Sequence, residues 1–187
     1  PEALIRYAND SGGKDNITAI VVRVVAADED EGRRRAAEVK LRLDTLRAVP
    51  LFRYLGYKGL VKIHNLVELN TFEADAVVFA EGSRGDAVYV VLDGRLALSK
   101  ADQRLTDVAP GGHVGELALV EKGPRQITAR ATEQTRTLVL RREALFEAMG
   151  ADARLSMKML WAIVQSTLGR LQVTRAELTA AWRAADQ

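Results

Sequence analysis

The sequence predicts an α+β protein in which an antiparallel β jelly-roll barrel is flanked by an N-terminal helical motif and long C-terminal helices. Residues 49–150 alternate short apolar runs with glycine-containing turns, a pattern typical of antiparallel strands. Residues 151–187 carry apolar side chains at helical spacing. The chain has 187 residues, 48% of them apolar, so it is long enough for one such domain with appendages.

Two segments precede the predicted barrel. We interpret residues 1–26 as the end of a helix, a turn at "NDSGGKDN" and a strand, "ITAIVVRVV", that is rich in β-branched residues. Residues 27–48 are predicted to form a linker helix, because acidic residues come before basic ones, as the helix dipole favours. Val39, Leu43 and Leu46 give this helix an apolar stripe.

The clearest strand pattern lies in "AVVFAEGSRGDAVYVVLDGRLALSK", residues 76–100. We expect two strands on either side of 82–86 and a further turn at 93–94, where an Asp-Gly pair favours chain reversal. Residues 49–150 are therefore predicted to be one β domain.

The helical pattern of residues 151–187 has an apolar side. Its members recur three, four or seven residues apart and are Leu160, Val164, Leu168, Leu171, Leu178 and Trp182. This row either packs against the barrel or pairs with the same helix of a second chain, since so long a segment outruns a small barrel. A homodimer through these helices is thus one expectation.

Composition excludes several classes of function. The chain has no cysteine, which removes disulfides and thiol nucleophiles, and only His64 and His113 could supply imidazole to a metal. Its net charge is +2, with Lys and Arg spread along the chain, so we expect no nucleic-acid partner. No apolar run approaches the length of a bilayer span, and we expect no membrane partner and a cytoplasmic location.

One segment carries recognisable chemistry: "GELALVEKGPR", residues 115–125. A short helical turn after Gly115 would direct backbone N–H groups at an anion, and Arg125 would close on it with a planar fork of donors. Glu116 suits a neighbouring hydroxyl donor, and Pro124 limits how the loop presents the arginine. A 3′,5′-cyclic phosphate beside a ribose 2′-OH has this arrangement of groups.

The extended segment "GELALVEKGPRQITARA", 115–131, resembles the phosphate-binding cassette of the cyclic nucleotide-binding domain family, as in kinase regulatory subunits and the catabolite activator protein. Segments 46–55, 73–98 and 109–119 resemble the family's helical motif, its paired strands and the approach to the cassette. The resemblance covers about residues 41–180 and implies that Glu116 accepts the ribose 2′-OH while Arg125 pairs with the cyclic phosphate. The ligand-binding residues that it implies are Gly115, Glu116, Leu117, Ala118, Arg125, Gln126, Ile127 and Thr174.

Some positions depart from the family pattern. The residue after the arginine is often Ala, Ser or Thr in the family, and here it is Gln126, which either crowds the phosphate or swings outward. Val114 replaces an aromatic residue and Asp75 a turn glycine. "LGRLQVT", 168–174, resembles the start of the long helix of the catabolite activator protein, so Thr174 is a candidate contact to the base. We expect cAMP rather than cGMP as the ligand.

The front of the chain, "ALIRYANDSGGKDNITAIVVRV", 3–24, resembles the C-terminal end of the Mg/Mn-dependent serine/threonine protein phosphatase family. That resemblance implies that Asp15 is a ligand for Mg²⁺ or Mn²⁺ in a full phosphatase. A two-metal hydrolase needs several acids from distant strands, so we expect this chain alone to be no enzyme. Pro1 in place of an initiator Met favours a fragment of a longer phosphatase, with residues 1–26 as its C-terminal remnant.

Two functions are therefore carried forward. The leading one is a non-enzymatic sensor of cyclic nucleotides, attached to an upstream phosphatase domain. The alternative is a degenerate cyclic nucleotide-binding fold that acts as a dimerisation or docking module without ligand.

Overall fold

The computed structural model describes residues 2–10 and 29–185, with some side chains of the last helix excepted. The chain divides into two compact units, residues 1–37 and 38–187. In the first, α1 (Glu2–Asp10) is a helix without buried residues. Helix α2 (Glu29–Ala48) begins in the first unit and ends in the second, which confirms the predicted helix but not the turn and strand of 11–26, which lie outside the described residues.

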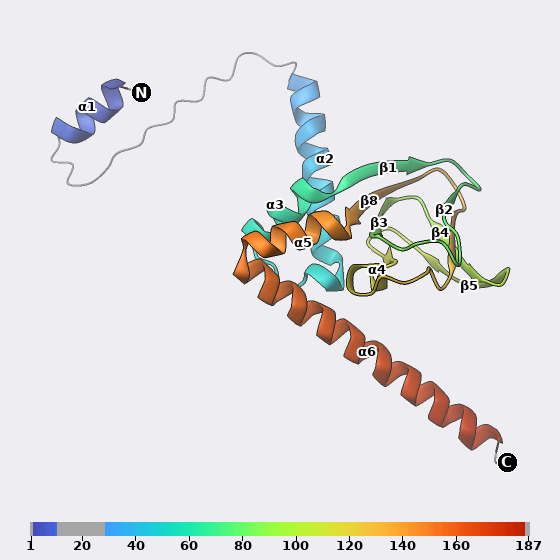
Figure 1. Ribbon diagram of the computed structural model, residues 1–187. Helices are drawn as coiled ribbons and strands as arrows, with labels where there is room; N and C mark the ends of the chain where they lie inside the picture. Colours follow the sequence, from blue (N-terminus) through green and yellow to red (C-terminus); the bar gives the residue numbers. More distant parts are fainter. Residues whose placement is uncertain (1, 11–28, 186–187) are drawn as a thin grey trace. The chain divides into compact units, whose positions relative to one another are not determined.

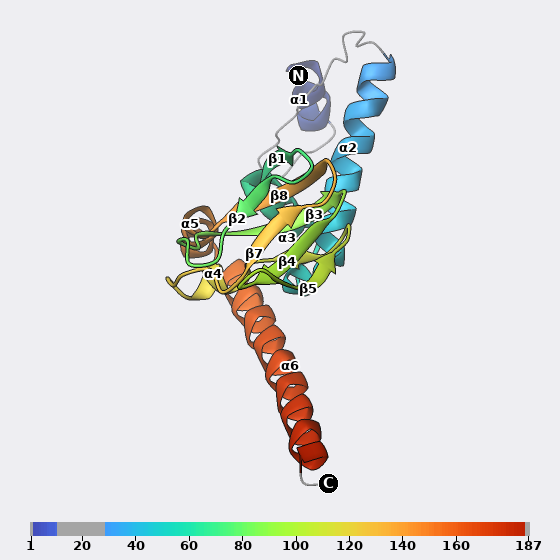
Figure 2. The ribbon, with the colours of Figure 1, turned by 90° about the vertical axis from the view of Figure 1, so that its right-hand side faces the viewer.

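The second unit contains two four-stranded antiparallel sheets. Their strands are β1 (Glu68–Phe72), β8 (Thr135–Arg141), β3 (Ala87–Asp93) and β6 (His113–Val114) in one sheet, and β2 (Val77–Phe79), β7 (Thr128–Ala131), β4 (Leu96–Lys100) and β5 (Gln103–Val108) in the other. Figure 2 shows β2, β7, β4 and β5 as one layer. Antiparallel sheets with flanking helices are confirmed as predicted. Closure into a barrel is not, because the described strands pair only within their own sheet.

Strand β3 is buried on both of its faces, which explains the nearly continuous apolar run "AVYVVL" in place of an alternating pattern. Val88 and Val90 point into a core shared with the helices. Val91 belongs to a second core between the two sheets, together with Leu96 and Val114. The sheet that contains β3 is therefore the middle layer, with helices on one side and the other sheet on the opposite side.

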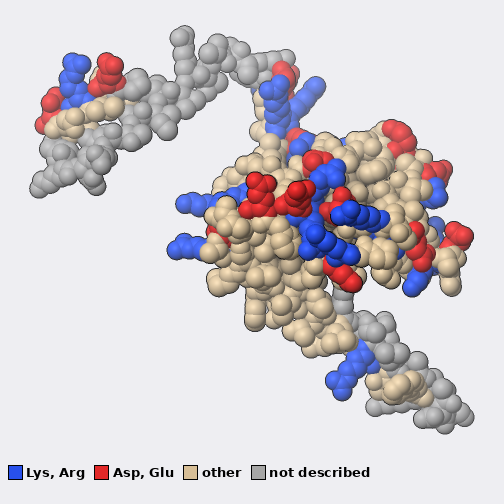
Figure 3. Space-filling view, viewed as in Figure 1, with Lys and Arg blue, Asp and Glu red and all other residues tan. Residues whose placement is uncertain are grey.

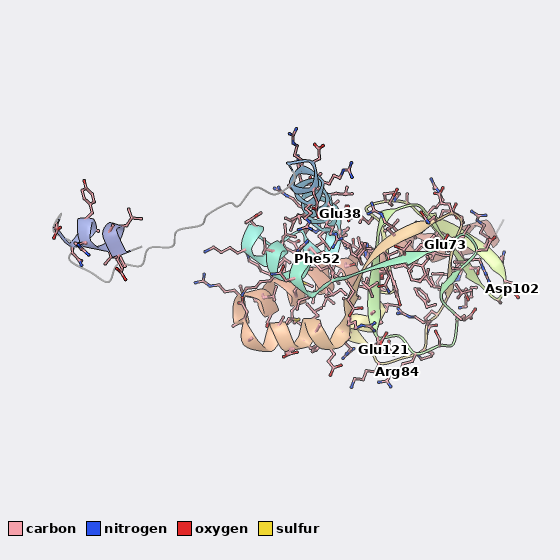
Figure 4. The ribbon with its side chains drawn as sticks, turned by 90° about the horizontal axis from the view of Figure 1, so that it is seen from above. Glu38, Phe52, Glu73, Arg84, Asp102 and Glu121 are labelled. Atoms are coloured by element: carbon pink, nitrogen blue, oxygen red, sulfur yellow. The ribbon has the colours of Figure 1, made fainter. Side chains whose placement is uncertain are left out.

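The helical layer consists of η1 (Pro50–Phe52), α3 (Tyr57–Leu66), α5 (Arg142–Ala151) and α6 (Ala153–Ala185) together with the end of α2. Its core residues are almost fully buried, among them Leu46, Phe52, Ile63, Leu145 and Met159. Figure 4 labels Phe52 within this layer, on the other side of the middle sheet from Asp102 at the β4–β5 turn. This layer confirms the predicted helical motif before the β domain and the helices after it.

The C-terminal helices are separated at Asp152, whose backbone is extended. Its carboxylate starts the next helix: Oδ1 accepts hydrogen bonds from the N–H groups of Arg154 (3.0 Å) and Leu155 (3.1 Å). The other carboxylate oxygen pairs with Lys62 of α3. The helices predicted over 151–187 are confirmed as far as residue 185.

Helix α6 packs through Leu155 and Met159, which are buried, and then leads away from the sheets (Figure 1). The predicted apolar row lies on its exposed side: Leu160, Val164, Leu168, Leu171 and Trp182 are 47–74% exposed. The row does not pack against the β domain, contrary to the first of the two interpretations given above; the side chain of Leu178 lies outside the described residues. Figure 3 shows uncharged surface along the first turns of this helix.

Charged side chains of both signs are mixed over the face of the β domain seen in Figure 3, as its modest net charge suggests. Within the part of the chain that the structure describes, no helix combines the length and apolar character that crossing a bilayer requires.

Candidate functional site

A cavity of about 310 Å³ opens between the loops that connect the two sheets. It is bounded by the end of β2, strand β6, the four-residue helix α4 (Leu117–Val120) and the loop that follows it. Its lining residues are Phe79, Gly85, Leu98, His113, Val114, Gly115, Glu116, Leu117, Ala118, Glu121, Gly123, Pro124, Arg125, Gln126 and Ile127.

The loop that carries Arg125 is held by main-chain hydrogen bonds to the β2–β3 loop. The Arg125 N–H donates to the carbonyl oxygen of Ser83 (2.7 Å), and the Gly82 N–H donates to the carbonyl oxygen of Arg125 (2.9 Å). Arg84 and Pro124 form a bridge beside these bonds. Figure 4 labels Arg84 and Glu121 at this edge of the molecule. Segments 40 residues apart in sequence thus form one wall, and Arg125 has a fixed backbone.

Arg125 is almost fully buried, with 6% of its surface exposed, and its side chain turns into the domain. Its Nη2 donates to the carbonyl oxygen of Ala87 (2.8 Å), and Nη1 donates weakly to that of Gly115 (3.3 Å). The guanidinium carbon lies 4.2 Å from the ring centre of Phe79 and 5.7 Å from that of Tyr89, within the range of a cation–π interaction. Two carbonyls and two aromatic faces therefore fix the cation.

Among the residues that the structure describes, Arg125 nevertheless has no acid within ion-pair distance. Its Nε is buried without a hydrogen bond, and Arg125 forms no ion pair with any residue that the structure describes. Burial lowers the pKa of Arg125, partly offset by the electrostatic attraction of Tyr89, Asp86 and Glu116. A cation in this situation is costly to keep out of water, so a bound anion would be favoured.

Glu116 lines the same cavity and supplies the carboxylate. It stands directly before α4 with helical backbone angles, and 13% of its side chain is exposed. Its Oε2 lies 4.0 Å from Nε2 of His113, whose side chain is similarly buried. Glu116 and Arg125, the acid and the base of segment 115–125, therefore reach one cavity.

Gly115 makes this convergence possible in two ways. Its φ of +84° is strained for any residue with a side chain, and an added Cβ would overlap Nη1 of Arg125. Glycine is thus required for the turn and for the close approach of the arginine.

The family model of the cyclic nucleotide-binding domain matches residues 69–152. This segment contains the whole cavity wall and, apart from the first residue of β1, the strands β1 to β8. Residues 69–152 are therefore similar to the cyclic nucleotide-binding domain family. The geometry described above agrees with this similarity, because the matched segment brings Glu116 and Arg125 to one cavity.

Proteins with known functions are similar to this part of the chain at moderate identity. The chain is 32% identical over 111 residues to a cAMP-dependent protein kinase regulatory subunit of Mycosarcoma maydis, which is 57% of this chain and 20% of that protein. It spans about a fifth to a quarter of the curated relatives that match it first.

Solved structures show the same fold. The N-terminal domain of a transcriptional regulator from Streptomyces coelicolor is 27% identical, with a TM-score of 0.63 over 70% of this chain and 94% of that one. The regulatory domain of Toxoplasma gondii PKA, crystallised with cAMP, is 28% identical, with a TM-score of 0.57 over 59% of this chain and 44% of that one.

Most site residues predicted from the sequence reach this cavity. Those that line it are Gly115, Glu116, Leu117, Ala118, Arg125, Gln126 and Ile127. Within the helical turn that was expected to direct N–H groups at an anion, the N–H of Ala118 donates to the Gly115 carbonyl oxygen (3.1 Å).

Three further expectations have different outcomes. Gln126 is exposed and its Nε2 donates to the Pro124 carbonyl oxygen (3.3 Å), which corresponds to the outward arrangement rather than to crowding of the phosphate. Thr174 belongs to α6, but its side chain lies outside the described residues. Asp15 also lies outside them, and the described residues contain no cluster of potential metal ligands.

Sequence reasoning missed Phe79, Tyr89 and His113. The rings of Phe79 and Tyr89 lie 5.6 Å apart between their centres, tilted by 39°, and face Arg125 from different sheets. In the sequence, each has the pattern of an ordinary core residue of a strand. Only the packing of the two sheets brings them to the arginine. The proximity of His113 to Glu116 was available as a spacing of three residues, which is common in any loop and therefore a weak signal.

Proposed function

We propose that the domain binds a 3′,5′-cyclic nucleotide, cAMP in preference to cGMP, in the cavity that Glu116 and Arg125 share. The observation that carries the proposal is the buried Arg125 guanidinium, which has donors to spare and no acidic partner among the described residues. The singly charged cyclic phosphate would supply that partner. Glu116 would accept the ribose 2′-OH.

The preference for cAMP is supported by the names of the relatives. The curated kinase regulatory subunit and the Toxoplasma gondii structure are described as a cAMP-dependent protein and as a complex with cAMP. The residue after the arginine is Gln126, not a Thr or Ser, which would have indicated cGMP.

The domain would act as a regulatory sensor through α6. Glu116 and Leu117 also line a second, smaller cavity whose opposite wall is Ile163, Ser166 and Thr167 of α6. A ligand that moves the segment after Gly115 would therefore change the surface against which α6 packs. Such a signal requires that the ligand bind two arrangements of α6 with different affinities.

Isothermal titration calorimetry with cAMP and cGMP tests the proposal, on the natural sequence and on Arg125→Ala. Removing a buried charge partner costs about 2–5 kcal/mol, so Arg125→Ala should weaken binding by a factor of about 30 to several thousand. Arg104→Ala is the matched control, since Arg104 is an exposed arginine outside the cavity that pairs with Asp107. Absence of heat with both nucleotides on the natural sequence would refute the function.

We further propose that the output of the sensor is a serine/threonine protein phosphatase domain, which needs Mg²⁺ or Mn²⁺. The support is the resemblance of residues 3–24 to the end of that family. Hydrolysis of a chromogenic phosphate ester in Mn²⁺, with and without cAMP, tests it on a longer protein that contains the upstream segment. The present chain is expected to show no hydrolysis. A cytoplasmic location remains a prediction.

The alternative of a dimerisation module without ligand has one observation in its favour, the exposed apolar row of α6. A second copy of α6 could cover it. Light scattering over a range of concentrations, with and without nucleotide, distinguishes the two functions. A concentration-dependent dimer that binds no nucleotide would favour the alternative.

A further inference from the structure

We propose that His113 is a positioning residue that holds the Glu116 carboxylate for a ribose hydroxyl, and that it thereby sets the selection of ribose over 2′-deoxyribose cyclic nucleotides. This inference rests on the proposed function, because it assigns a role within the same cavity. It adds His113 to the pair formed by Glu116 and Arg125.

The geometry places the imidazole ring beside the carboxylate. His113 belongs to β6, whose pairing with β3 sets His113 opposite Val90 and so fixes its backbone. Its Nε2 lies 4.0 Å from Oε2 of Glu116, and the two side chains are 14% and 13% exposed. Both line the cavity, so the pair is largely withdrawn from water at the point where a ligand would enter.

A carboxylate held at one oxygen can present the other. With a proton on Nε2, the ring can donate towards Oε2 after a small approach, and the carboxylate, which has about four lone-pair sites, can accept a ligand hydroxyl as well. The strength of a hydrogen bond to a charged acceptor depends on this alignment, because it weakens steeply as the angle departs from linear.

The second charge in the cavity makes such a restraint necessary. Arg125 attracts Glu116 electrostatically, and it is the cation reserved for the phosphate in the proposed complex. A carboxylate that turned to Arg125 would compete with the phosphate and leave the ribose without an acceptor. By donating to Glu116, His113 would keep the acid and the base available for separate groups of the ligand.

The test compares the affinities of cAMP and 2′-deoxy-cAMP for the full chain. A hydrogen bond to a charged group accounts for about a tenfold to hundredfold preference for cAMP in the natural sequence. In His113→Ala the preference should fall below about threefold, while the affinity for 2′-deoxy-cAMP changes by less than about threefold. His113→Gln retains a donor and should keep part of the preference. His64→Gln, which removes the other histidine, should keep all of it.

A general loss of packing would weaken the binding of both ligands by the same factor. The ratio of the two affinities therefore distinguishes a positioning role from a purely structural one. An unchanged ratio in His113→Ala would overturn the inference while leaving cyclic nucleotide binding intact. If the natural sequence binds neither nucleotide, the proposed function fails and this inference fails with it.

Should both His113 variants unfold, the natural sequence still allows a decision. Only two histidines occur, so NMR can follow the His113 ring directly, with His64→Gln as the assignment. Its signals should shift on addition of cAMP and shift differently with 2′-deoxy-cAMP. Identical shifts for the two ligands would contradict the proposed role.

Discussion

Replacement of Gly115 by alanine perturbs the site by a single methyl group. The backbone at Gly115 has φ +84°, and the methyl carbon would overlap Nη1 of Arg125 and lie 3.1 Å from the carbonyl oxygen of Ala87. The neighbours that must yield are therefore the guanidinium and the carbonyl group that accepts its shorter hydrogen bond, 2.8 Å long. The expected result is a folded domain with a misplaced arginine.

The magnitude has two parts. Left-handed backbone costs an alanine about 1–2 kcal/mol of stability, wherever it occurs. A shift of about 1 Å in a group that must meet its partner precisely costs about a hundredfold in a preorganised site. We therefore expect Gly115→Ala to lower the free energy of unfolding moderately and to weaken cAMP binding by about a hundredfold.

Gly111→Ala is the control, because Gly111 has nearly the same φ, +82°, while its added methyl group would meet nothing within 4 Å. Denaturant unfolding should show a similar loss of stability for both variants apart from the overlap at Gly115. Calorimetry should show weakened binding for Gly115→Ala alone. Equal affinities in the two variants would refute the assignment of Arg125 as the phosphate partner positioned by Gly115.

Three further outcomes follow from the same geometry. Gly94→Ala should lower stability by about 2–4 kcal/mol in denaturant unfolding, more than Gly111→Ala, since its methyl would lie 2.5 Å from an oxygen of the 134–135 turn. The hydrogen bond from Lys62 lowers the pKa of Asp152 below its ordinary 3.8. The resulting stability is present above that value and is lost as the pH falls through the lower folded pKa. Melting temperatures between about pH 5 and 2 should therefore fall less steeply in Lys62→Met, and equal slopes would contradict the pair. Phe79→Leu removes the nearer aromatic face from the arginine and should weaken cAMP binding by about three- to thirtyfold in calorimetry, with an unchanged affinity as the contrary result.

Much of the fold could be predicted because local signals and tertiary structure agree. The chain does bend at Gly94, whose φ is +83°, where it passes from β3 in one sheet to β4 in the other, and the linker helix ends as its pattern indicates. The separation into two sheets could not be predicted, since it depends on pairings such as β1 with β8 between residues about 70 positions apart. The exposed row of α6 was also ambiguous, because an apolar stripe has the same spacing whether it meets a sheet or a second helix.

The candidate site, like the fold, could be predicted only where its residues lie close together in the sequence. The spacing of Glu116 and Arg125 was visible because both belong to one loop, and their convergence needs only a turn at Gly115. What surrounds the arginine was not visible, since Phe79 and Tyr89 come from different sheets and the carbonyl of Ala87 carries no side-chain signal. These neutral groups hold the cation without neutralising it. An acid at their place would have formed a permanent ion pair, with no charge left for a ligand to satisfy, so the absence of an acidic partner among the described residues is what makes Arg125 available for an anion.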